Sequence, residues 1–279
     1  MIEIKDLEYT YKSGTHALQN INLQIKKGEF VAIVGHNGSG KSTLSKLMAG
    51  IDIPSRGAVL INEINTKDKS RVLNLRKTIG IVFQNPENQI VFEKVADDMA
   101  FGLKNLGVAP AEIDKRIAHI TKLMKIEHFS DAFELSMGQK QRVTIAGVLA
   151  MQPECIIFDE PTAMLDPKGK KDIHNIIVDL HKQGLTIVYV TNVIDEVLSA
   201  DRIIILSQGH IKYEFEKEAL FDNVAKLKEL GLETPIILDI IYRLKNQGIT
   251  MAVKNYTIDA LIETITRRME TPGGAIKIP

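Results

Sequence analysis

Residues 30–42 contain the feature that most limits how this chain can fold. The segment FVAIV, residues 30–34, is continuously apolar, which is typical of a strand buried on both faces of a parallel sheet. GHNGSGKS follows at residues 35–42 with the spacing G-x-x-x-x-G-K-S. KSTLSKLMAG then has helical character and ends at Gly50. A strand, a glycine-rich turn and a helix in this order predict a phosphate-binding loop, or P-loop.

The residue types of this loop suit the phosphates of a nucleotide. Glycines let backbone N–H groups turn inward, and the helix N-terminus adds a field that favours negative charge. We expect Lys41 to reach the β- and γ-phosphates and the Ser42 hydroxyl to ligate Mg²⁺. A chance glycine turn is the alternative, which the Lys-Ser pair in register disfavours. The predicted nucleotide-binding positions are Gly35, Asn37, Gly38, Ser39, Gly40, Lys41, Ser42 and Thr43.

A second apolar segment, CIIF at residues 155–158, ends in two adjacent carboxylates. Ligands of open α/β sheets sit at the carboxyl ends of the strands, so we expect both carboxylates at the same edge as the P-loop. Asp159 would hold the magnesium shell, and Glu160 could polarise the attacking water as a base. A solvated turn before Pro161 is the alternative, and the presence of the P-loop disfavours it.

The stretch LSMGQKQRV, residues 135–143, places Ser136 and Gly138 directly before a predicted helix. Serine is a favoured N-cap, so an ordinary helix cap is one interpretation. The same stretch also makes a second anion-seeking helix terminus, although the chain has only one P-loop lysine. This combination suggests that the second terminus meets the nucleotide of another subunit.

Taken in order and spacing, these features resemble the ATPase subunits of ABC-type transporters over about the first 215 residues. The resemblance implies a head-to-tail dimer in which two nucleotides lie between the Walker motifs of one subunit and the signature loop of the other. The motifs that carry it are Tyr11, GHNGSGKS, Gln84, LSMGQ, IIFDEP, the LD pair at 165–166 and the polar residue at 192.

The resemblance also implies individual roles, with ATP and Mg²⁺ as the bound species. Tyr11 would stack on adenine, although an aromatic residue near a strand end is as often simply packed. Gln84 would sense the γ-phosphate, the attacking water and the metal, and Asp166 would communicate across the dimer. The signature residues that would meet the partner's nucleotide are Ser136, Gly138 and Gln139.

Two finer features resemble the ATPase subunits of energy-coupling factor (ECF) importers. A Q-P-E-Q-rich stretch occupies residues 82–102, and a methionine replaces the first glycine of the LSGGQ signature. The resemblance implies a heterodimer with a second, related ATPase, docked under a transmembrane coupling protein near residues 84–104. The pair would power uptake of a vitamin or metal ion captured by a separate membrane protein. Ile90, Val91 and Phe92 are candidates for the coupling contact, with core packing as the alternative.

Position 192 departs from the family, where a histidine normally contacts the γ-phosphate. Asn192 keeps an amide donor but loses the imidazole's charge and titratable proton. We therefore hypothesise that Asn192 belongs to the catalytic set with Glu160 and Gln84, but that the site on this P-loop is slowed. Retention of Glu160 argues against complete inactivity. The alternative is that Asn192 only caps a helix entering VIDE.

The predicted fold is α/β, namely a P-loop NTPase of the ABC cassette type. It combines a mainly parallel sheet with crossover helices, an antiparallel β part near the N-terminus and a helical signature subdomain. We assign residues 1–215 to the nucleotide-binding domain, with the helical subdomain at about 85–150. Residues 220–279 form a small helical appendage that would contact the dimer partner and end in a mobile tail. Further strands are expected at 1–9, 21–25, 58–62, 186–190 and 202–206, and helices over 95–126, after Gly138 and around 173–180.

Composition bounds the partners. Lys+Arg and Asp+Glu are 35 each in 279 residues, so there is no overall field to attract nucleic acid, and none is expected as a partner. The single cysteine, Cys155, reads as a small buried hydrophobe in a reducing compartment. No apolar run approaches the roughly 20 residues that span a bilayer, so other subunits would hold this chain at the cytoplasmic face of the membrane. The competing hypotheses are a soluble, non-transport ABC ATPase and a regulatory module that does not hydrolyse ATP.

Overall fold

The computed structural model describes residues 1–247 and 258–270, and the predicted tail at 271–279 lies outside them. The N-terminal part is an antiparallel sheet with strand order β2-β1-β4-β5. Apolar residues alternate along its strands, because one face packs on the core and the other meets solvent. Its strands are β1 (Ile2–Thr10), β2 (His16–Ile25), β4 (Arg56–Ile61) and β5 (Ile64–Asn65).

The second sheet has the order β10-β9-β3-β8-β7-β6, and all its pairs are parallel except β10 with β9. Every residue of β3, β7 and β8 is buried, which explains their continuously apolar sequences. The mainly parallel sheet is therefore confirmed. Its strands are β3 (Phe30–Val34), β6 (Ile79–Val82), β7 (Cys155–Asp159), β8 (Thr186–Thr191), β9 (Arg202–Ser207) and β10 (His210–Glu216).

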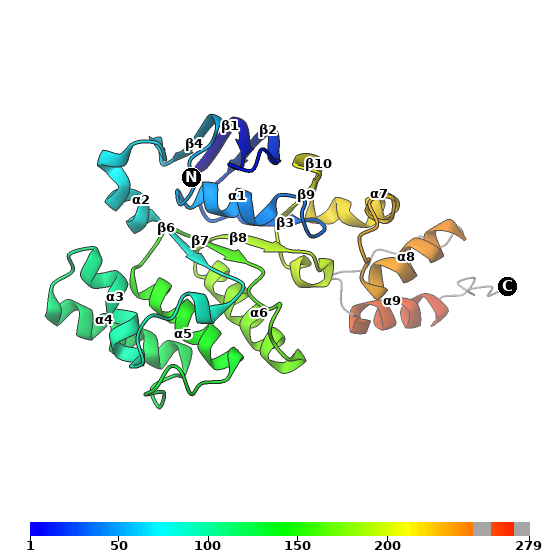
Figure 1. Cartoon of the computed structure of the whole chain (residues 1–279). Coiled ribbons are helices and arrows are strands. Elements are labelled where there is room, and N and C mark those ends of the chain that lie inside the picture. The colour runs from blue at the N-terminus through cyan, green and yellow to red at the C-terminus, as the bar shows by residue number, and fades with distance from the viewer. Residues whose placement is uncertain (248–257, 271–279) are drawn as a thin grey trace.

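Helix α1 (Lys41–Met48) lies between the two sheets (Figure 1). Leu44, Leu47 and Met48 are fully buried and share one apolar cluster with residues of both sheets. Gly50 has φ +63 just beyond the helix, as the predicted glycine stop requires. The helix that begins at the P-loop is thus held on two sides, so its N-terminus is fixed relative to the strand ends.

Helices α3, α4 and α5 form a group below the parallel sheet in Figure 1. The helical pattern over 95–126 corresponds to two helices rather than one, and Pro110 opens the second as predicted. Ile113, Ile120 and Met124 are buried on one face of that helix. The elements of this region and its flanks are α2 (Val72–Thr78), α3 (Val95–Asn105), α4 (Pro110–Met124), α5 (Met137–Ala150) and α6 (Pro167–Lys182), with short 3₁₀ turns η1 (Lys69–Arg71) and η2 (Pro86–Asn88).

Among the strands and α-helices of the described residues, four were not expected from the sequence, namely α2, β5, β6 and β10. The alternation of β10 is hidden because only Phe215 among its seven residues is buried, as suits an edge strand. Gln208 and Gly209 both have positive φ and connect β9 to β10 as a two-residue hairpin. The change of character noted beyond Gly209 is therefore an edge hairpin, and the sheet continues to Glu216.

The C-terminal segment is helical, as predicted. Leu220, Val224 and Leu227 are buried. They belong to the same apolar cluster as the face of the parallel sheet that packs against helices α3 to α6. Ile236 is 72% exposed, so the second amphipathic stretch turns only part of its apolar residues toward this core. We call residues 217–247 and 258–270 the appendage. Its elements are η4 (Lys217–Asn223), α7 (Val224–Glu229), α8 (Ile236–Asn246) and α9 (Ile258–Glu270).

The burial expected for Cys155 is confirmed. Cys155 is fully buried, and this burial raises the pKa of its thiol to about 12, so it is an inert core residue. No helix among residues 1–247 and 258–270 combines the length and apolar character needed to cross a bilayer.

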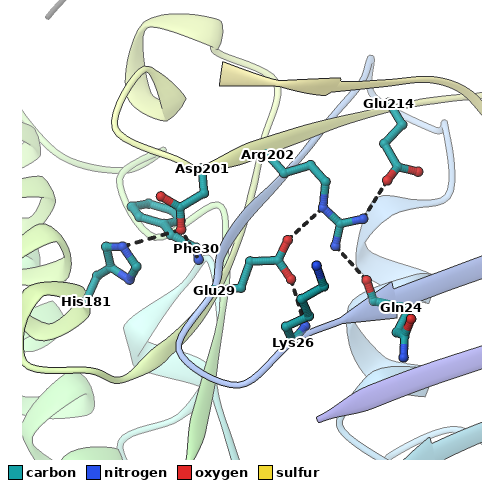
Figure 2. Close-up of polar contacts among 8 residues, drawn as sticks. All are labelled: Gln24, Lys26, Glu29, Phe30, His181, Asp201, Arg202 and Glu214. Carbon is teal, nitrogen blue, oxygen red and sulfur yellow. Dashed lines mark hydrogen bonds and ion pairs between the residues drawn. The ribbon is translucent and has the colours of Figure 1, made fainter. Parts of the chain in front are cut away.

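A polar hub centred on Arg202 joins the two sheets (Figure 2). Arg202 begins β9 beside Val31, near the start of β3, so the hub lies at the sheet edge opposite the P-loop, which follows the end of β3. The guanidinium donates to Glu29 Oε1 at 2.7 Å, to Glu214 Oε1 at 2.5 Å and to the Gln24 carbonyl at 2.5 Å. The side chains of Arg202 and Glu29 are only 12% and 13% exposed. A buried guanidinium with three acceptors ties β9 and β10 to the β2–β3 turn.

We expect Arg202→Met to lower the free energy of unfolding by about 2 to 4 kcal/mol, because it leaves the shielded Glu29 carboxylate without its partner. Denaturant unfolding followed by circular dichroism measures the change. Arg243→Ala is the matched control, since that arginine pairs with Asp239 on α8 while 75% exposed, and it should cause no measurable change. Equal effects of the two substitutions would contradict the structural role of the hub.

Candidate functional site

The P-loop lysine is buried against the loop's own backbone. Lys41 is 4% exposed, and its Nζ donates to the carbonyls of Gly35 at 2.8 Å and His36 at 3.0 Å. The same Nζ lies 3.6 Å from Glu160 Oε1. Burial lowers the pKa of Lys41, and the nearby Glu160 carboxylate opposes that shift. The ammonium group is therefore held in position at the strand ends by contacts within the chain.

Two glycines of the loop are required by space. A Cβ at Gly35 would lie 2.1 Å from the Leu206 carbonyl oxygen, and one at Gly40 would lie 2.7 Å from the Ala17 carbonyl oxygen. Gly40 also has φ +104, a conformation that side chains rarely adopt. The glycines of the motif thus allow close packing against neighbouring strands as well as inward-facing N–H groups.

The two carboxylates lie beside the P-loop, as their strand predicts. Ser42 Oγ donates to Asp159 Oδ1 at 3.1 Å, and burial raises the pKa of Asp159 to about 6. Glu160 follows β7 with φ +49, in the left-handed region, while its N–H donates to the Val190 carbonyl at 2.8 Å. A non-glycine residue in this conformation is strained, and such strain concentrates at functional sites.

The described residues fit a magnesium nucleotide. Ser39 Oγ is buried and has no hydrogen-bond partner among them, so its hydroxyl could donate a hydrogen bond to a phosphate oxygen. Ser42 and Asp159 offer adjacent hard oxygen atoms, which are the ligands that Mg²⁺ prefers. A cation at this point would also offset the cost of ionising the buried Asp159.

A cavity of about 490 Å³ opens above the P-loop. Tyr11 stands at its wall, 39% exposed, with its hydroxyl 2.6 Å from Thr43 Oγ1 and its ring edge-on to Tyr9. Gln84 and Glu160 line the same cavity from other segments. The further lining residues are Thr15, His16, Ala17, Asn37, Gly38, Gly40, Lys41, Ser42 and Thr43.

The signature residues line a different cavity, of about 320 Å³. Ser136 caps α5 in a reciprocal pair, because its Oγ accepts from the Gln139 N–H at 3.4 Å and Gln139 Oε1 accepts from the Ser136 N–H at 2.9 Å. The helix-cap interpretation of Ser136 is thus confirmed. Asp166 lines this cavity too, and it caps α6 by accepting from the Gly169 N–H at 2.9 Å. Gly138 lines the same cavity and lies within the first turn of α5.

Comparisons with known proteins agree with this geometry. The sequence profile of the family described as "ABC transporter" matches residues 18–163. The energy-coupling factor transporter ATP-binding protein EcfA1 of Clostridium novyi (strain NT) is 44% identical over 272 residues, which cover 95% of this chain and 97% of that protein. The chain belongs to the ABC transporter family. Within that family it is an energy-coupling factor ATP-binding subunit and an ATP hydrolase.

Other members of the ABC transporter family give the same result. EcfA of Methanosarcina acetivorans is 43% identical over 90% of this chain and 92% of its own length. The structure described as "cbiO1 from clostridium perfringens: Part of the ABC transporter complex cbiONQ" has a TM-score of 0.73 at 38% identity, covering 86% of this chain and 97% of that one. A dimeric, post-hydrolysis structure of MJ0796 bound to ADP and Pi has a TM-score of 0.71 at 35% identity, with 78% and 99% covered. These likenesses confirm the ABC fold.

Asn192 does not line either cavity. It lies on an exposed bend after β8, and the element that follows is the short 3₁₀ turn η3 (Ile194–Val197) rather than an α-helix. Val193 is the N-cap of η3, and its N–H donates to Thr191 Oγ1 at 3.1 Å. The helix-cap explanation of Asn192 is therefore wrong, because Thr191 supplies the local side-chain acceptor.

Glu196 supports the segment that follows Glu160, and sequence reasoning missed it. Its carboxylate accepts from Thr162 Oγ1 at 2.6 Å, Tyr189 OH at 3.1 Å and Thr191 Oγ1 at 2.9 Å. The three hydroxyl-bearing residues are buried, and Thr162 follows Glu160 by two positions. Glu196 therefore ties the segment after β7 to the segment after β8. Only the fold brings these residues together, so no local pattern in the sequence marks them.

The three candidates for membrane contact separate in the structure. Ile90 is 8% exposed and belongs to the core, so core packing, the alternative given for this residue, is confirmed. Val91 and Phe92 are exposed, and their N–H groups both donate to Asp98 Oδ1, at 2.7 and 3.2 Å. Phe92 also packs against the exposed Phe101 with ring centroids 5.5 Å apart. The surface of this segment thus presents two exposed phenylalanine rings on a backbone that the Asp98 carboxylate holds in place.

Proposed function

We propose that the chain binds ATP with Mg²⁺ in the cavity at the P-loop and hydrolyses it there. Lys41 would bind the β- and γ-phosphates, Glu160 would take the proton of the attacking water, and Gln84 would orient that water. Bound Mg²⁺, held by Ser42, Asp159 and Gln84, would neutralise phosphate charge. Burial of Lys41, its contacts within the loop and its 3.6 Å approach to Glu160 support these roles.

The nucleotide site is composite in this proposal. The observation that carries it is that the P-loop residues and the signature residues line two separate cavities of one chain. Ser136, Gly138 and Gln139 would close over the nucleotide of a second, related ATPase, and Asp166 would contact that partner. The dimeric MJ0796 structures show that relatives of this fold pair. We expect a heterodimer rather than a homodimer, because this is what the resemblance to ECF ATPase subunits implies.

The pair would couple ATP hydrolysis to uptake of a vitamin or metal ion at the cytoplasmic face of the membrane. Its partners would be a transmembrane coupling protein, docked near residues 84–104, and a separate substrate-binding membrane protein. Relatives named as energy-coupling factor transporter components, and one described as part of the complex cbiONQ, support this assignment. Residues 1–215 would form the nucleotide-binding domain, with residues 220–279 as an appendage touching the partner.

Co-purification tests the proposal. The tagged chain, isolated from detergent-solubilised membranes of its source cell, should bring down a second ABC ATPase and two membrane proteins, and the purified set should hydrolyse ATP. Reconstitution in vesicles would then show uptake of a vitamin or metal ion only with ATP. A tagged chain that enriches soluble proteins and no membrane partner would support the soluble ABC ATPase instead.

The asparagine at position 192 supports the hypothesis that the two ATP sites of the dimer hydrolyse ATP at unequal rates. If the family histidine gives a charge-assisted bond in the transition state, its absence costs about 1 to 3 kcal/mol. We therefore expect Asn192→His to raise the turnover of the assembled complex about 10- to 100-fold at this site. No change with Asn192→His, together with complete loss of activity with Glu160→Gln, would contradict the unequal-sites hypothesis.

The asparagine at position 192 also favours a second candidate function, in which the chain is a regulatory subunit that binds nucleotide without hydrolysing it. Single-turnover hydrolysis at this site, measured with the partner's P-loop lysine replaced, separates the two. Phosphate release under these conditions counts against the regulatory subunit, and retained, unhydrolysed ATP supports it.

A further inference from the structure

The side chain of one P-loop residue contacts the appendage. His36 Nε2 lies 2.6 Å from the carbonyl oxygen of Leu230, 194 positions away in the sequence. A carbonyl oxygen can only accept, so Nε2 is the ring nitrogen that carries the proton in this contact. The loop that surrounds Lys41 is thereby joined to the end of α7.

The appendage presents this carbonyl through a defined helix ending. The N–H of Gly231 donates to the Lys228 carbonyl at 2.9 Å, and the N–H of Leu232 donates to the Leu227 carbonyl at 3.0 Å. This pair of bonds, with Gly231 at φ +68, is a Schellman ending, and the buried Leu227 and Leu232 supply its apolar contact. The carbonyl of Leu230 takes no part in that pattern and is directed at His36.

The backbone of His36 holds the phosphate loop from the other side. Its carbonyl accepts from Lys41 Nζ at 3.0 Å and from the Ser39 N–H at 3.1 Å. The peptide that positions the lysine is therefore attached to the residue whose ring is fixed by the appendage. A displacement of the His36 backbone would therefore disturb both the contact with Lys41 and the contact with Leu230.

Packing at Gly231 provides an independent observation. A Cβ built there would lie 3.4 Å from His36 Nε2, and the positive φ disfavours any side chain. The chain thus leaves room for the imidazole to reach the Leu230 carbonyl. Because Leu227 and Leu232 belong to the central apolar cluster, the position of this turn follows the packing of the whole appendage.

We propose that the appendage braces the phosphate loop, with His36 as the positioning residue, so that the placement of α7 sets the affinity of the P-loop for nucleotide. The inference rests on the proposed binding of ATP at this loop. His36 acts through Lys41 and Ser39 and does not itself contact the phosphates. Any movement of the appendage on assembly would then change nucleotide affinity directly.

Equilibrium binding of a fluorescent ATP analogue to the full chain tests the brace. We expect His36→Ala to raise the Kd about five- to ten-fold, the effect of one lost hydrogen bond. His36→Gln should restore most of the affinity, because its amide nitrogen can donate to the Leu230 carbonyl. Gly231→Ala should weaken binding in the same direction, and combining it with His36→Ala should add little. His119→Ala, at an exposed histidine on α4, is the control and should leave the Kd unchanged.

The controls separate this inference from the proposed function. If the wild-type chain fails to bind the analogue, or binds equally after Lys41→Ala, the proposed ATP site is wrong. If wild type binds, Lys41→Ala does not and His36→Ala matches wild type, the brace is wrong while the ATP site stands. Thermal unfolding midpoints of His36→Ala and His36→Gln should differ by no more than the loss of one hydrogen bond allows, and a larger loss of stability in His36→Ala alone would assign the residue a merely structural role.

Discussion

Replacing Lys41 with alanine is expected to reduce ATP turnover of the assembled complex at this site by at least about 10³-fold. The side chain is 4% exposed and already oriented by two carbonyl contacts, so its charge meets the phosphates at little entropic cost. A loss of about 4 kcal/mol of transition-state stabilisation corresponds to this factor. Steady-state phosphate release, with the partner's P-loop disabled, measures it.

Lys77→Ala provides the matched control for that experiment. Lys77 is an exposed lysine on α2, away from the P-loop cavity, and its removal changes the net charge by the same amount. It should leave turnover unchanged within two-fold. Comparable losses in both variants would show that overall charge, rather than the placed ammonium group, accounts for the effect.

Replacing Glu160 with glutamine should separate binding from chemistry. The amide has nearly the shape of the carboxylate but cannot take a proton, so we expect turnover to fall about 10²- to 10⁴-fold. ATP affinity should hold or increase, because the substitution removes a negative charge 3.6 Å from Lys41 in a cavity built for phosphates. Nucleotide retention by equilibrium binding and single-turnover phosphate release measure the two quantities separately.

Glu154→Gln is the corresponding control for Glu160. Glu154 precedes the same strand, β7, at its opposite end, where it pairs with Lys27 at 2.8 Å. Its loss should change neither turnover nor binding. If Glu160→Gln kept wild-type phosphate release, Glu160 could not be the base, and the proton would have to leave by another route.

The P-loop and the two carboxylates could be predicted because each is a local pattern with a physical reason. All five residues of β3 and the first four of β7 are apolar and buried, and both strands end at the same sheet edge, where β7 closes on the buried Asp159. Lys41, Asp159 and Glu160 therefore had to come together once the sheet was parallel. Position 192 was also correctly placed after a strand, because β8 is equally apolar.

Features that depend on distant contacts could not be predicted in this way. Glu196 receives the Thr162 hydroxyl, in addition to the two donors from β8, only after β7 and β8 lie side by side, and it looks like any surface glutamate in the sequence. The contact of His36 with Leu230 joins segments that no periodicity relates. The sequence could not decide between surface and core for Ile90, because an apolar residue in a segment with exposed neighbours can still turn inward.

The left-handed backbone at Glu160 has a consequence for which amino acids can follow β7. With φ +49, a β-branched residue such as valine, isoleucine or threonine would clash with its own main chain, whereas glycine, asparagine and aspartate fit readily. The backbone conformation after β7 therefore restricts which side chains can occupy position 160. It admits compact or unbranched side chains, so inactive variants with an intact fold are accessible by single substitutions at this position.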